Sequence, residues 1–344
     1  MGFREELAEQ ARVLDALLSK ESGCICISES MDISSFDSVV FAGMGSSYYA
    51  GIYGAVLFNR VGIKAVALEA SELSHYHRSL LDDSTLLIAI SQSGESTETM
   101  ELVRSIKGRN TMVMTNRPQG ELGCLADIGV VDIMAGEEKA TSTKTYTNTL
   151  GTIVLLARYA FGIGFSGWEE GVGDALALMR TWLSRAEDLG REISDFFSGI
   201  RYLVYMGSGL SQANALHAAL ITGEMSGEMA TATTVGQFFH GLIEQVDHRY
   251  GVIALGGSSL PSPVFQQACF EVVKAGGRLV SIGSTIDCAD FMEGEKQKYF
   301  HLAASLPADV YACWAEIVPV ECFAYMWSLA KGREPGVLHR VQKK

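Results

Sequence analysis

Residues 84–100, STLLIAISQSGESTETM, join an apolar run to a cluster of hydroxyl side chains. Leucine, isoleucine and alanine fill residues 86–90, which is typical of a strand buried on both faces of a sheet. The pattern after residue 97 is amphipathic and predicts a helix. The turn between them carries four residues with hydroxyl or amide side chains: Ser91, Gln92, Ser93 and Ser96. The stretch therefore predicts a buried parallel strand whose carboxyl end turns directly into a helix.

This turn has the chemistry of an anion site. In an open α/β sheet, anions bind at the carboxyl ends of strands, where free backbone N–H groups and the positive end of a helix dipole meet. Gly94 lets the backbone approach a ligand closely, and serine hydroxyls donate hydrogen bonds without adding positive charge. A phosphate monoester fits such a site. The alternative is an ordinary turn in which the serines only cap the helix.

Strand-like and helix-like segments alternate on both sides of this turn. SVVFAG at residues 38–43 and TMVMT at residues 111–115 are separated from the central strand by helical patterns, which predicts a parallel sheet. A second series begins near residue 201, where VYMGSGL at residues 204–210 matches the earlier FAGMGSS at residues 41–47. We therefore predict an α/β fold of two tandem, doubly wound, flavodoxin-like parallel-sheet lobes with helices on both faces.

The predicted boundaries follow from this repeat. Residues 1–37 should form an N-terminal helical segment, and residues 38–199 should form the first lobe together with helices that bridge to the second. Residues 200–344 should form the second lobe and a C-terminal tail. With this little chain before the first strand, we expect no further domain at the N-terminus.

Charge and composition exclude some partners. The formal net charge is −13 and no basic run exceeds the two final lysines, so the phosphate-neutralising surface that nucleic-acid binding requires is not expected. Hydrophobic residues make up 48% of the chain and charged residues 19%, which favours surface buried in a homo-oligomer.

Neither a membrane span nor a metal site is expected. The longest apolar stretch, residues 150–165, is short for a span and contains Arg158, so it predicts a core helix. The N-terminus has acidic residues from the start, unlike a secretory signal. The seven cysteines are scattered without zinc or redox spacing, which indicates reduced thiols in a cytoplasmic protein.

Three motifs resemble the sugar isomerase (SIS) family. GMGSSYYAG at residues 43–51, SQSGESTE at residues 91–98 and ATSTKTYTN at residues 140–148 are similar, in this order, to its first module. Within the family they resemble the isomerase part of glucosamine-6-phosphate synthase and related glucosamine-6-phosphate deaminases and fructosamine-6-phosphate deglycases. EELAEQARVL at residues 5–14 resembles the segment that leads into this module.

The resemblance implies positions for a sugar phosphate. The phosphate would be held by five residues of the two glycine-containing turns: Ser47, Ser91, Gln92, Ser93 and Ser96. The sugar itself would be lined by Ser46, Ala140 and Thr141. No metal and no organic cofactor is implied.

The second half resembles the family's catalytic segment. ALITGEMSGEMATATTVGQFFHG at residues 219–241 places a glutamate and a histidine at the family's spacing. The resemblance implies that Glu224 moves a proton between C1 and C2 of the sugar, and that His240 opens the ring. It also implies a homodimer with the site at the subunit junction, where His240 would come from the neighbouring chain.

The chain departs from the family pattern at three places. Leu242 follows Gly241 where the family has proline directly after His-Gly, and Ile221 replaces a lysine three residues before Glu224. Arg340 stands where the family has a C-terminal catalytic lysine. Arginine keeps the charge but is a poor proton donor and a poor Schiff-base amine, so a lysine-dependent step is not expected at this position, and Lys343 or Lys344 is the alternative source of an amine.

The function expected from these residues is an aldose–ketose isomerase, deaminase or deglycase that acts on a hexose 6-phosphate or an amino-sugar 6-phosphate. A glutaminase domain is not expected before residue 38. One alternative is a non-catalytic sugar-phosphate sensor, and another is a SIS-type lyase. A nucleotide cofactor at the glycine turn of residues 43–45, with Glu69 at the end of the next strand, is a minor alternative.

Overall fold

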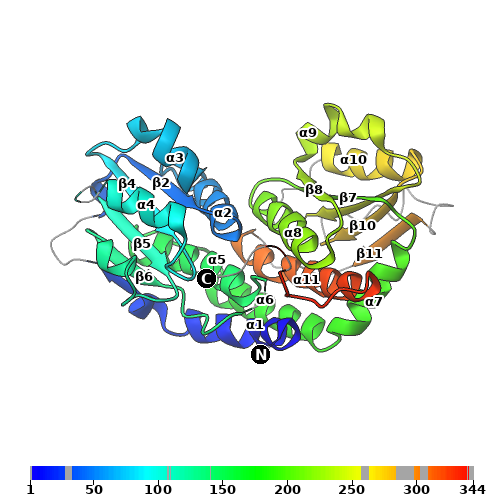
Figure 1. Ribbon diagram of the computed structural model, residues 1–344, viewed down its shortest axis with the longest axis horizontal. Coiled ribbons are helices and arrows are strands. Elements are labelled where there is room, and N and C mark those ends of the chain that lie inside the picture. The colour runs from blue at the N-terminus through cyan, green and yellow to red at the C-terminus, as the bar shows by residue number, and fades with distance from the viewer. Residues whose placement is uncertain are drawn as a thin grey trace. The chain divides into compact units, whose positions relative to one another are not determined.

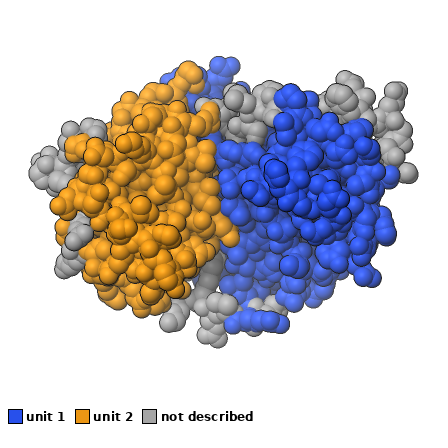
Figure 2. Space-filling model, turned by 90° about the horizontal axis from the view of Figure 1, so that it is seen from above, with its two compact units in different colours: residues 1–8, 139–141, 167–342 blue, residues 9–138, 142–166, 343–344 orange. Residues whose placement is uncertain are grey.

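The chain divides into two compact units, coloured separately in Figure 2. The computed structural model describes residues 2–27, 33–106, 108, 110–139, 141–256, 263–283, 298–302, 309–338 and 340. Unit 1 comprises residues 1–8, 139–141 and 167–342, and unit 2 comprises residues 9–138, 142–166 and 343–344.

Unit 2 is built on a six-stranded sheet with the strand order β1-β6-β5-β4-β2-β3 (Figure 1). Five of its strands are parallel, and β1 pairs antiparallel with β6 at one edge. The strands are β1 (Ile25–Ile27), β2 (Ser38–Gly43), β3 (Ala65–Glu69), β4 (Thr85–Ile90), β5 (Thr111–Thr115) and β6 (Gly129–Asp132). The segment before residue 38, expected to be helical, therefore also contributes the edge strand β1.

Helices cover both faces of this sheet. On one face lies α2 (Ser46–Arg60), packed against α5 (Lys144–Tyr159). A Cβ added at Gly54 of α2 would lie 2.8 Å from the Phe41 ring, so this glycine permits the close approach of α2 to β2. On the opposite face, α3 (Ala70–Tyr76) and α4 (Thr97–Ser105) bury Val40 and Ala42, which alternate with Phe41 along β2. The core helix predicted over residues 150–165 is confirmed as far as Tyr159, where α5 ends, and residues 150–157 of this helix are buried.

Unit 1 is built on a five-stranded, fully parallel sheet with the order β11-β10-β9-β7-β8. Its strands are β7 (Tyr202–Gly207), β8 (Ala230–Thr233), β9 (Tyr250–Leu255), β10 (Arg278–Ile282) and β11 (Tyr299–Leu302). One face is covered by α8 (Ser211–Ser226) and α11 (Ala312–Ala330), and the other by α9 (Val235–Phe239) and α10 (Pro263–Lys274) (Figure 1).

The described part of the chain contains further helices. They are α1 (Phe3–Leu18), α6 (Trp168–Leu183) and α7 (Ala186–Phe196), with the short 3-10 helices η1 (Glu21–Cys24), η2 (Ile33–Ser35), η3 (Arg78–Leu80), η4 (Gly123–Leu125), η5 (Leu242–Gln245) and η8 (Asp309–Tyr311).

The sequence suggested that α6 and α7 close the first lobe and bridge to the second, whereas both helices belong to unit 1. Two glycines explain the difference. A Cβ added at Gly190 of α7 would lie 2.1 Å from the Cys322 carbonyl oxygen, and one at Gly171 of α6 would lie 2.4 Å from the Tyr311 ring. Both helices therefore pack closely on α11 and the residues just before it, which ties them to the second sheet.

The two sheets share one topology. Numbered from β2 and from β7, both parallel sheets have the order 2-1-3-4-5, which is the flavodoxin-like order. The predicted fold class of doubly wound parallel sheets with helices on both faces is confirmed. In such folds the switch point, where the strand order reverses, is the usual ligand-binding position. It lies between β2 and β4 in unit 2 and between β7 and β9 in unit 1.

No helix in the described parts of the chain is both long enough and apolar enough to cross a membrane.

Candidate functional site

The switch point of unit 2 brings two serine-containing turns together. β2 ends at Gly43 and α2 begins at Ser46, while β4 ends at Ile90. A Cβ added at Gly43 would lie 2.9 Å from both the Ile90 carbonyl oxygen and the Ser47 Cβ. Only glycine allows the start of α2 to approach the end of β4 so closely. Ser47 therefore lies beside the strand end from which the second turn, Ser91–Ser96, leaves.

The backbone of this second turn, called the serine loop below (Ser91–Ser96), presents free donors. The Ser91 N–H donates to the Met114 carbonyl at 3.0 Å, and the Gly94 N–H donates to the Ser91 carbonyl at 3.1 Å. Gly94 has a φ of +68°, a left-handed conformation that favours glycine. Within the described part of the chain, four N–H groups here have no hydrogen-bond acceptor: those of Gln92, Ser93, Ser96 and Thr97. A turn with several free N–H groups before a helix is suited to an anion.

The serine side chains have different roles. The Ser93 hydroxyl accepts from the Glu95 N–H at 3.1 Å, which leaves its own proton available to a ligand. Ser96 is the N-cap of α4, because its hydroxyl accepts from the Thr99 N–H and donates to the Glu98 carboxylate at 3.2 Å. Both expectations for the serines thus have support: Ser96 caps the helix, and Ser93 keeps a free donor.

The expected sugar-lining residues are only partly described. Ser46 is the first residue of α2 and is half-buried, and Ala140 lies outside the described residues. Thr141 is fully buried, and its hydroxyl has no hydrogen-bond partner within the described chain. A buried hydroxyl without a partner is costly, so Thr141 is a position at which a ligand oxygen would be favourable.

The predicted catalytic pair lies in unit 1. Glu224 occupies the last turn of α8 and is half-buried, and His240 follows α9 and is exposed. Glu224 and His240 therefore belong to segments on opposite faces of the five-stranded sheet. The serine loop and Thr141 lie in unit 2 and unit 1, respectively.

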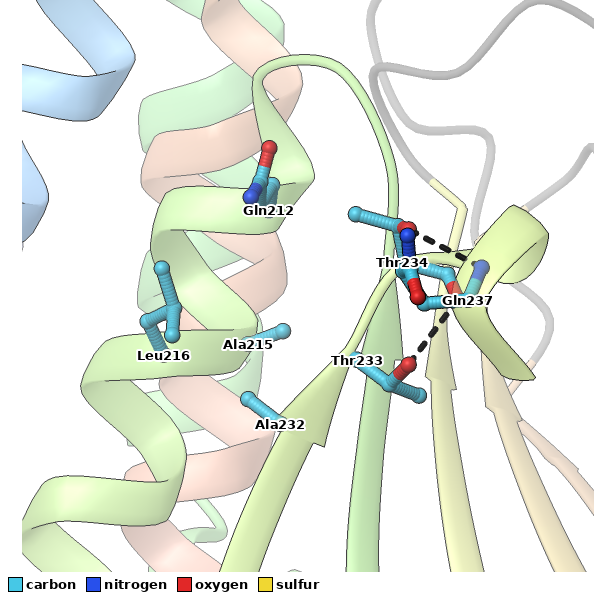
Figure 3. A pocket seen from close by; sticks show the side chains of 7 residues that line it. All are labelled: Gln212, Ala215, Leu216, Ala232, Thr233, Thr234 and Gln237. Carbon is cyan, nitrogen blue, oxygen red and sulfur yellow. Dashed lines mark hydrogen bonds between the residues drawn. The ribbon is translucent and has the colours of Figure 1, made fainter. Parts of the chain in front are cut away.

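A small cavity of about 200 Å³ lies beside α9 and is lined only by uncharged side chains (Figure 3). Figure 3 shows residues of α8 on one side of the strands and Gln237 of α9 on the other. The Thr234 hydroxyl caps α9 by accepting from the Gln237 N–H at 3.3 Å. The Ser208 hydroxyl accepts from the Val235 N–H at 3.3 Å. These two caps fix the start of the short helix that His240 follows.

The positions that depart from the family pattern carry no amine. Ile221 is fully buried, and Arg340 is exposed with no described chain after it. The two lysines at positions 343 and 344 lie outside the described residues. No group of three or more His, Cys, Asp or Glu side chains in the described ranges could hold a metal ion.

The sequence did not assign a role to two charged pairs of unit 2. Glu95 in the serine loop pairs with Arg117, and the Lys144 ammonium lies 2.6 Å from the Glu9 carboxylate of α1. Arg117 directly follows Asn116 after the TMVMT strand. The signal that could have found it is positional, because carboxyl ends of neighbouring parallel strands meet at one edge of a sheet.

The motifs, the fold and the switch-point turn together define a class of domain. Residues 32–159 match the SIS domain model, which confirms the resemblance seen in the sequence: this part of the chain is a SIS domain. The second sheet has the same strand order, but its assignment as a second SIS domain remains a prediction.

Curated proteins and solved structures also resemble the chain. The chain is 28% identical over 344 residues to a glutamine–fructose-6-phosphate aminotransferase (isomerizing) of Thermococcus kodakarensis, covering 96% of this chain and 55% of the relative. It therefore spans about half the length of the curated relatives that it matches. Two solved structures share the fold over 98% of both chains. They are the C-terminal domain of a glucosamine-fructose-6-phosphate aminotransferase from Francisella tularensis (TM-score 0.85, 21% identity) and a glucosamine-6-phosphate deaminase from Thermotoga maritima (TM-score 0.77, 20% identity).

Proposed function

We propose that this protein is a sugar-phosphate enzyme of the aldose–ketose isomerase, deaminase or deglycase type, acting on a hexose 6-phosphate or an amino-sugar 6-phosphate. The observation that carries the proposal is the serine loop at the switch point, with three free backbone N–H groups, a fourth at Thr97 directly after it, and the free Ser93 proton. The SIS match over the same residues and the activities of the relatives support this choice of substrate class.

The serine loop would bind the phosphate and leave the sugar carbons to other residues. Ser47 and the hydroxyls and amides of the serine loop would hold the phosphate oxygens, and Thr141 would meet a sugar oxygen. Such anchoring positions the reacting carbons relative to the catalytic groups, which supplies part of the rate enhancement.

Glu224 would act as the base that moves a proton between C1 and C2, and His240 would assist ring opening. The two residues belong to segments on opposite faces of their sheet, which supports a site shared between two chains. We therefore propose a cytoplasmic homodimer in which one subunit supplies Glu224 and its partner supplies the histidine. Neither a metal nor an organic cofactor has a part in this proposal.

A sugar-phosphate sensor is the second candidate. The observation in its favour is that Ile221 and Arg340 stand where the family carries lysines, so a step through a lysine amine would not be available. A sensor would bind the same phosphate without turnover.

The test is a panel of hexose 6-phosphates, amino-sugar 6-phosphates and fructosamine 6-phosphates, in which thermal shift is recorded together with ammonia or ketose formation. The enzyme proposal predicts turnover of at least one panel member by the wild type. Glu224→Gln should lose at least 100-fold in turnover while the thermal shift remains. Glu228→Gln is the matched control, because this nearby half-buried glutamate pairs with Lys331 at 3.3 Å and has no proposed chemical role. A thermal shift without turnover would favour the sensor, and no shift with any phosphate would contradict both candidates.

A further inference from the structure

Glu95 places a negative charge inside the loop that is proposed to bind phosphate. It lies between Gly94 and Ser96, and its side chain is 45% exposed. The free N–H groups of Ser93 and Ser96 flank it on either side. An uncompensated carboxylate at this position would repel a phosphate dianion and weaken the field of the N–H groups. The binding of phosphate therefore requires that the charge of Glu95 be cancelled.

Arg117 cancels this charge. Its guanidinium donates to the Glu95 carboxylate from the residue that follows Asn116, just beyond the carboxyl end of β5. Among the described residues, Arg117 is the one cation that forms an ion pair with the acidic residue of the serine loop. The pair borders a cavity of about 370 Å³ between α4 and residues 117–121, which Ser93 and Gly94 also line.

The backbone around Arg117 is fixed to the serine loop. The Asn116 N–H donates to the Gln92 carbonyl at 3.1 Å, and the Arg117 N–H donates to the Thr115 hydroxyl at 3.2 Å. The Asn116 side chain accepts from the Ala135 N–H at 2.8 Å. These bonds hold the base of the arginine side chain beside the serine loop independently of the ion pair.

The pair itself contributes little to stability, because both side chains are about half exposed and solvent screens such pairs strongly. The main effect of the pair is that it cancels the negative charge of Glu95 beside the serine loop. A second pair on the same cavity, Arg104 with Glu121, is similarly exposed and connects α4 to residue 121 without involving the serine loop. The two pairs therefore differ in whether they neutralise an acid of the serine loop, and this difference can be tested.

We propose that Arg117 is a positioning residue of the phosphate site that acts by neutralising Glu95, and that it is not itself a phosphate ligand. This inference rests on the proposed phosphate-binding function of the serine loop. Glu98, the next acid along the chain, accepts a hydrogen bond from the Ser96 hydroxyl at 3.2 Å and has no cation paired with it in the described part of the chain. Arg117 thus lowers the net negative charge of the serine loop by neutralising Glu95.

The experiment measures inorganic phosphate and glucose 6-phosphate binding by isothermal titration at low ionic strength. The proteins are the full chain and four variants: Arg117→Ala, Glu95→Gln, the double variant with both changes, and Arg104→Ala. We expect Arg117→Ala to weaken binding about tenfold, and Glu95→Gln to bind as tightly as the wild type or more tightly. The double variant should recover to within about twofold of the wild type, since the repelling charge is gone. Arg104→Ala should bind like the wild type.

Three outcomes would overturn the proposal. Unchanged binding by Arg117→Ala would show that Glu95 does not need neutralising. A double variant as weak as Arg117→Ala would show that the arginine contacts the phosphate or clamps the serine loop mechanically. Absence of binding by the wild type would overturn the phosphate site itself, and the inference with it. Melting temperatures without phosphate show whether each variant is folded, and Arg117→Gln replaces Arg117→Ala if the latter is not.

Discussion

The Lys144 ammonium lies 2.6 Å from the Glu9 carboxylate, and the lysine side chain is only 3% exposed. Lys144 opens α5 and Glu9 belongs to α1, so the pair joins two segments that are distant in the chain. Thr147 makes a second link by donating to the Gln10 side chain at 2.6 Å. The motif that resembles the SIS family thus has a structural function in unit 2 besides its proposed place near the sugar.

Glu9→Gln should lower the free energy of unfolding by about 2–4 kcal/mol, because it leaves a buried ammonium without its counter-charge. Denaturant unfolding at pH 7 measures this loss. Arg12→Gln is the control: Arg12 contacts the same carboxylate but is 71% exposed, and its removal should cost less than about 0.5 kcal/mol. Equal losses for both variants would contradict this account of the pair.

The same pair predicts acid sensitivity. The hydrogen bond from Lys144 lowers the pKa of Glu9 below its usual 4.5, and the smaller effect of burial opposes this. A carboxyl with a lowered folded-state pKa stabilises the fold above its unfolded pKa, and this contribution is lost as the pH falls through the folded value. The stability difference between wild type and Glu9→Gln should therefore shrink below about pH 4.5. A difference that stays constant from pH 7 to pH 3 would show that the ion pair is not its source.

The buried His217 predicts a second loss of stability in acid, which begins at a higher pH than the loss due to Glu9. Burial lowers the pKa of His217 to about 3, although Glu321 lies 3.8 Å from its Nε2 atom. The folded state keeps the imidazole neutral while the unfolded chain protonates it below about pH 6.5, so stability falls as the pH drops below that value. Between pH 7 and pH 5, the free energy of unfolding of the wild type should fall by about 2 kcal/mol more than that of His217→Gln. Parallel pH profiles of the two proteins would contradict a neutral buried histidine.

Close helix packing explains why α7 belongs to unit 1, and it can be tested at one glycine. Gly190→Ala would place a methyl group 2.1 Å from the Cys322 carbonyl oxygen, so the unfolding free energy should fall by about 3 kcal/mol or more. Gly173→Ala in α6 is the matched control, since nothing lies within 4 Å of its added Cβ. That variant should be stabilised by up to about 1 kcal/mol through helix propensity. Similar effects at both positions would contradict the packing argument.

Two serines should separate capping from phosphate binding. Ser96→Ala removes the N-cap of α4 and should cost about 1 kcal/mol of stability besides weakening phosphate binding. The Ser47 hydroxyl has no hydrogen-bond partner in the described parts of the chain, so Ser47→Ala should leave the melting temperature unchanged. It should nevertheless weaken glucose 6-phosphate binding about fivefold to tenfold, as measured by titration. Unchanged binding by Ser47→Ala would remove this residue from the site.

Most of the sheet architecture could be predicted because it follows from local patterns. Buried parallel strands are nearly continuous apolar runs, so β2, β4, β5, β7 and β9 stand out in the sequence. The edge strand β1 has only three residues, too few to show a pattern. The unit to which α6 and α7 belong depends on the surface against which Gly171 and Gly190 pack. This packing is set by the tertiary structure and leaves no local pattern in the sequence.

The site was predictable only at its serines. A polar turn directly after a buried strand marks Ser91–Ser96 within one stretch of sequence. No local pattern marks Arg117, since its proximity to Glu95 arises from the meeting of two neighbouring strand ends. Glu224 and His240 were proposed from family spacing, and their positions on opposite faces of one sheet appear only in the structure.

Proton transfer at C1 and C2 is the central claim, and deuterium exchange tests it most directly. The measurement is incubation of the wild type with fructose 6-phosphate or glucosamine 6-phosphate in D₂O, followed by NMR of the C1 and C2 protons. The account predicts that deuterium enters at one of these carbons in at least one of the two sugars, and that Glu224→Gln abolishes this exchange while titration shows that the sugar phosphate still binds. Binding by the wild type without exchange at either carbon would contradict an isomerase-type enzyme and leave the sensor as the function of this site.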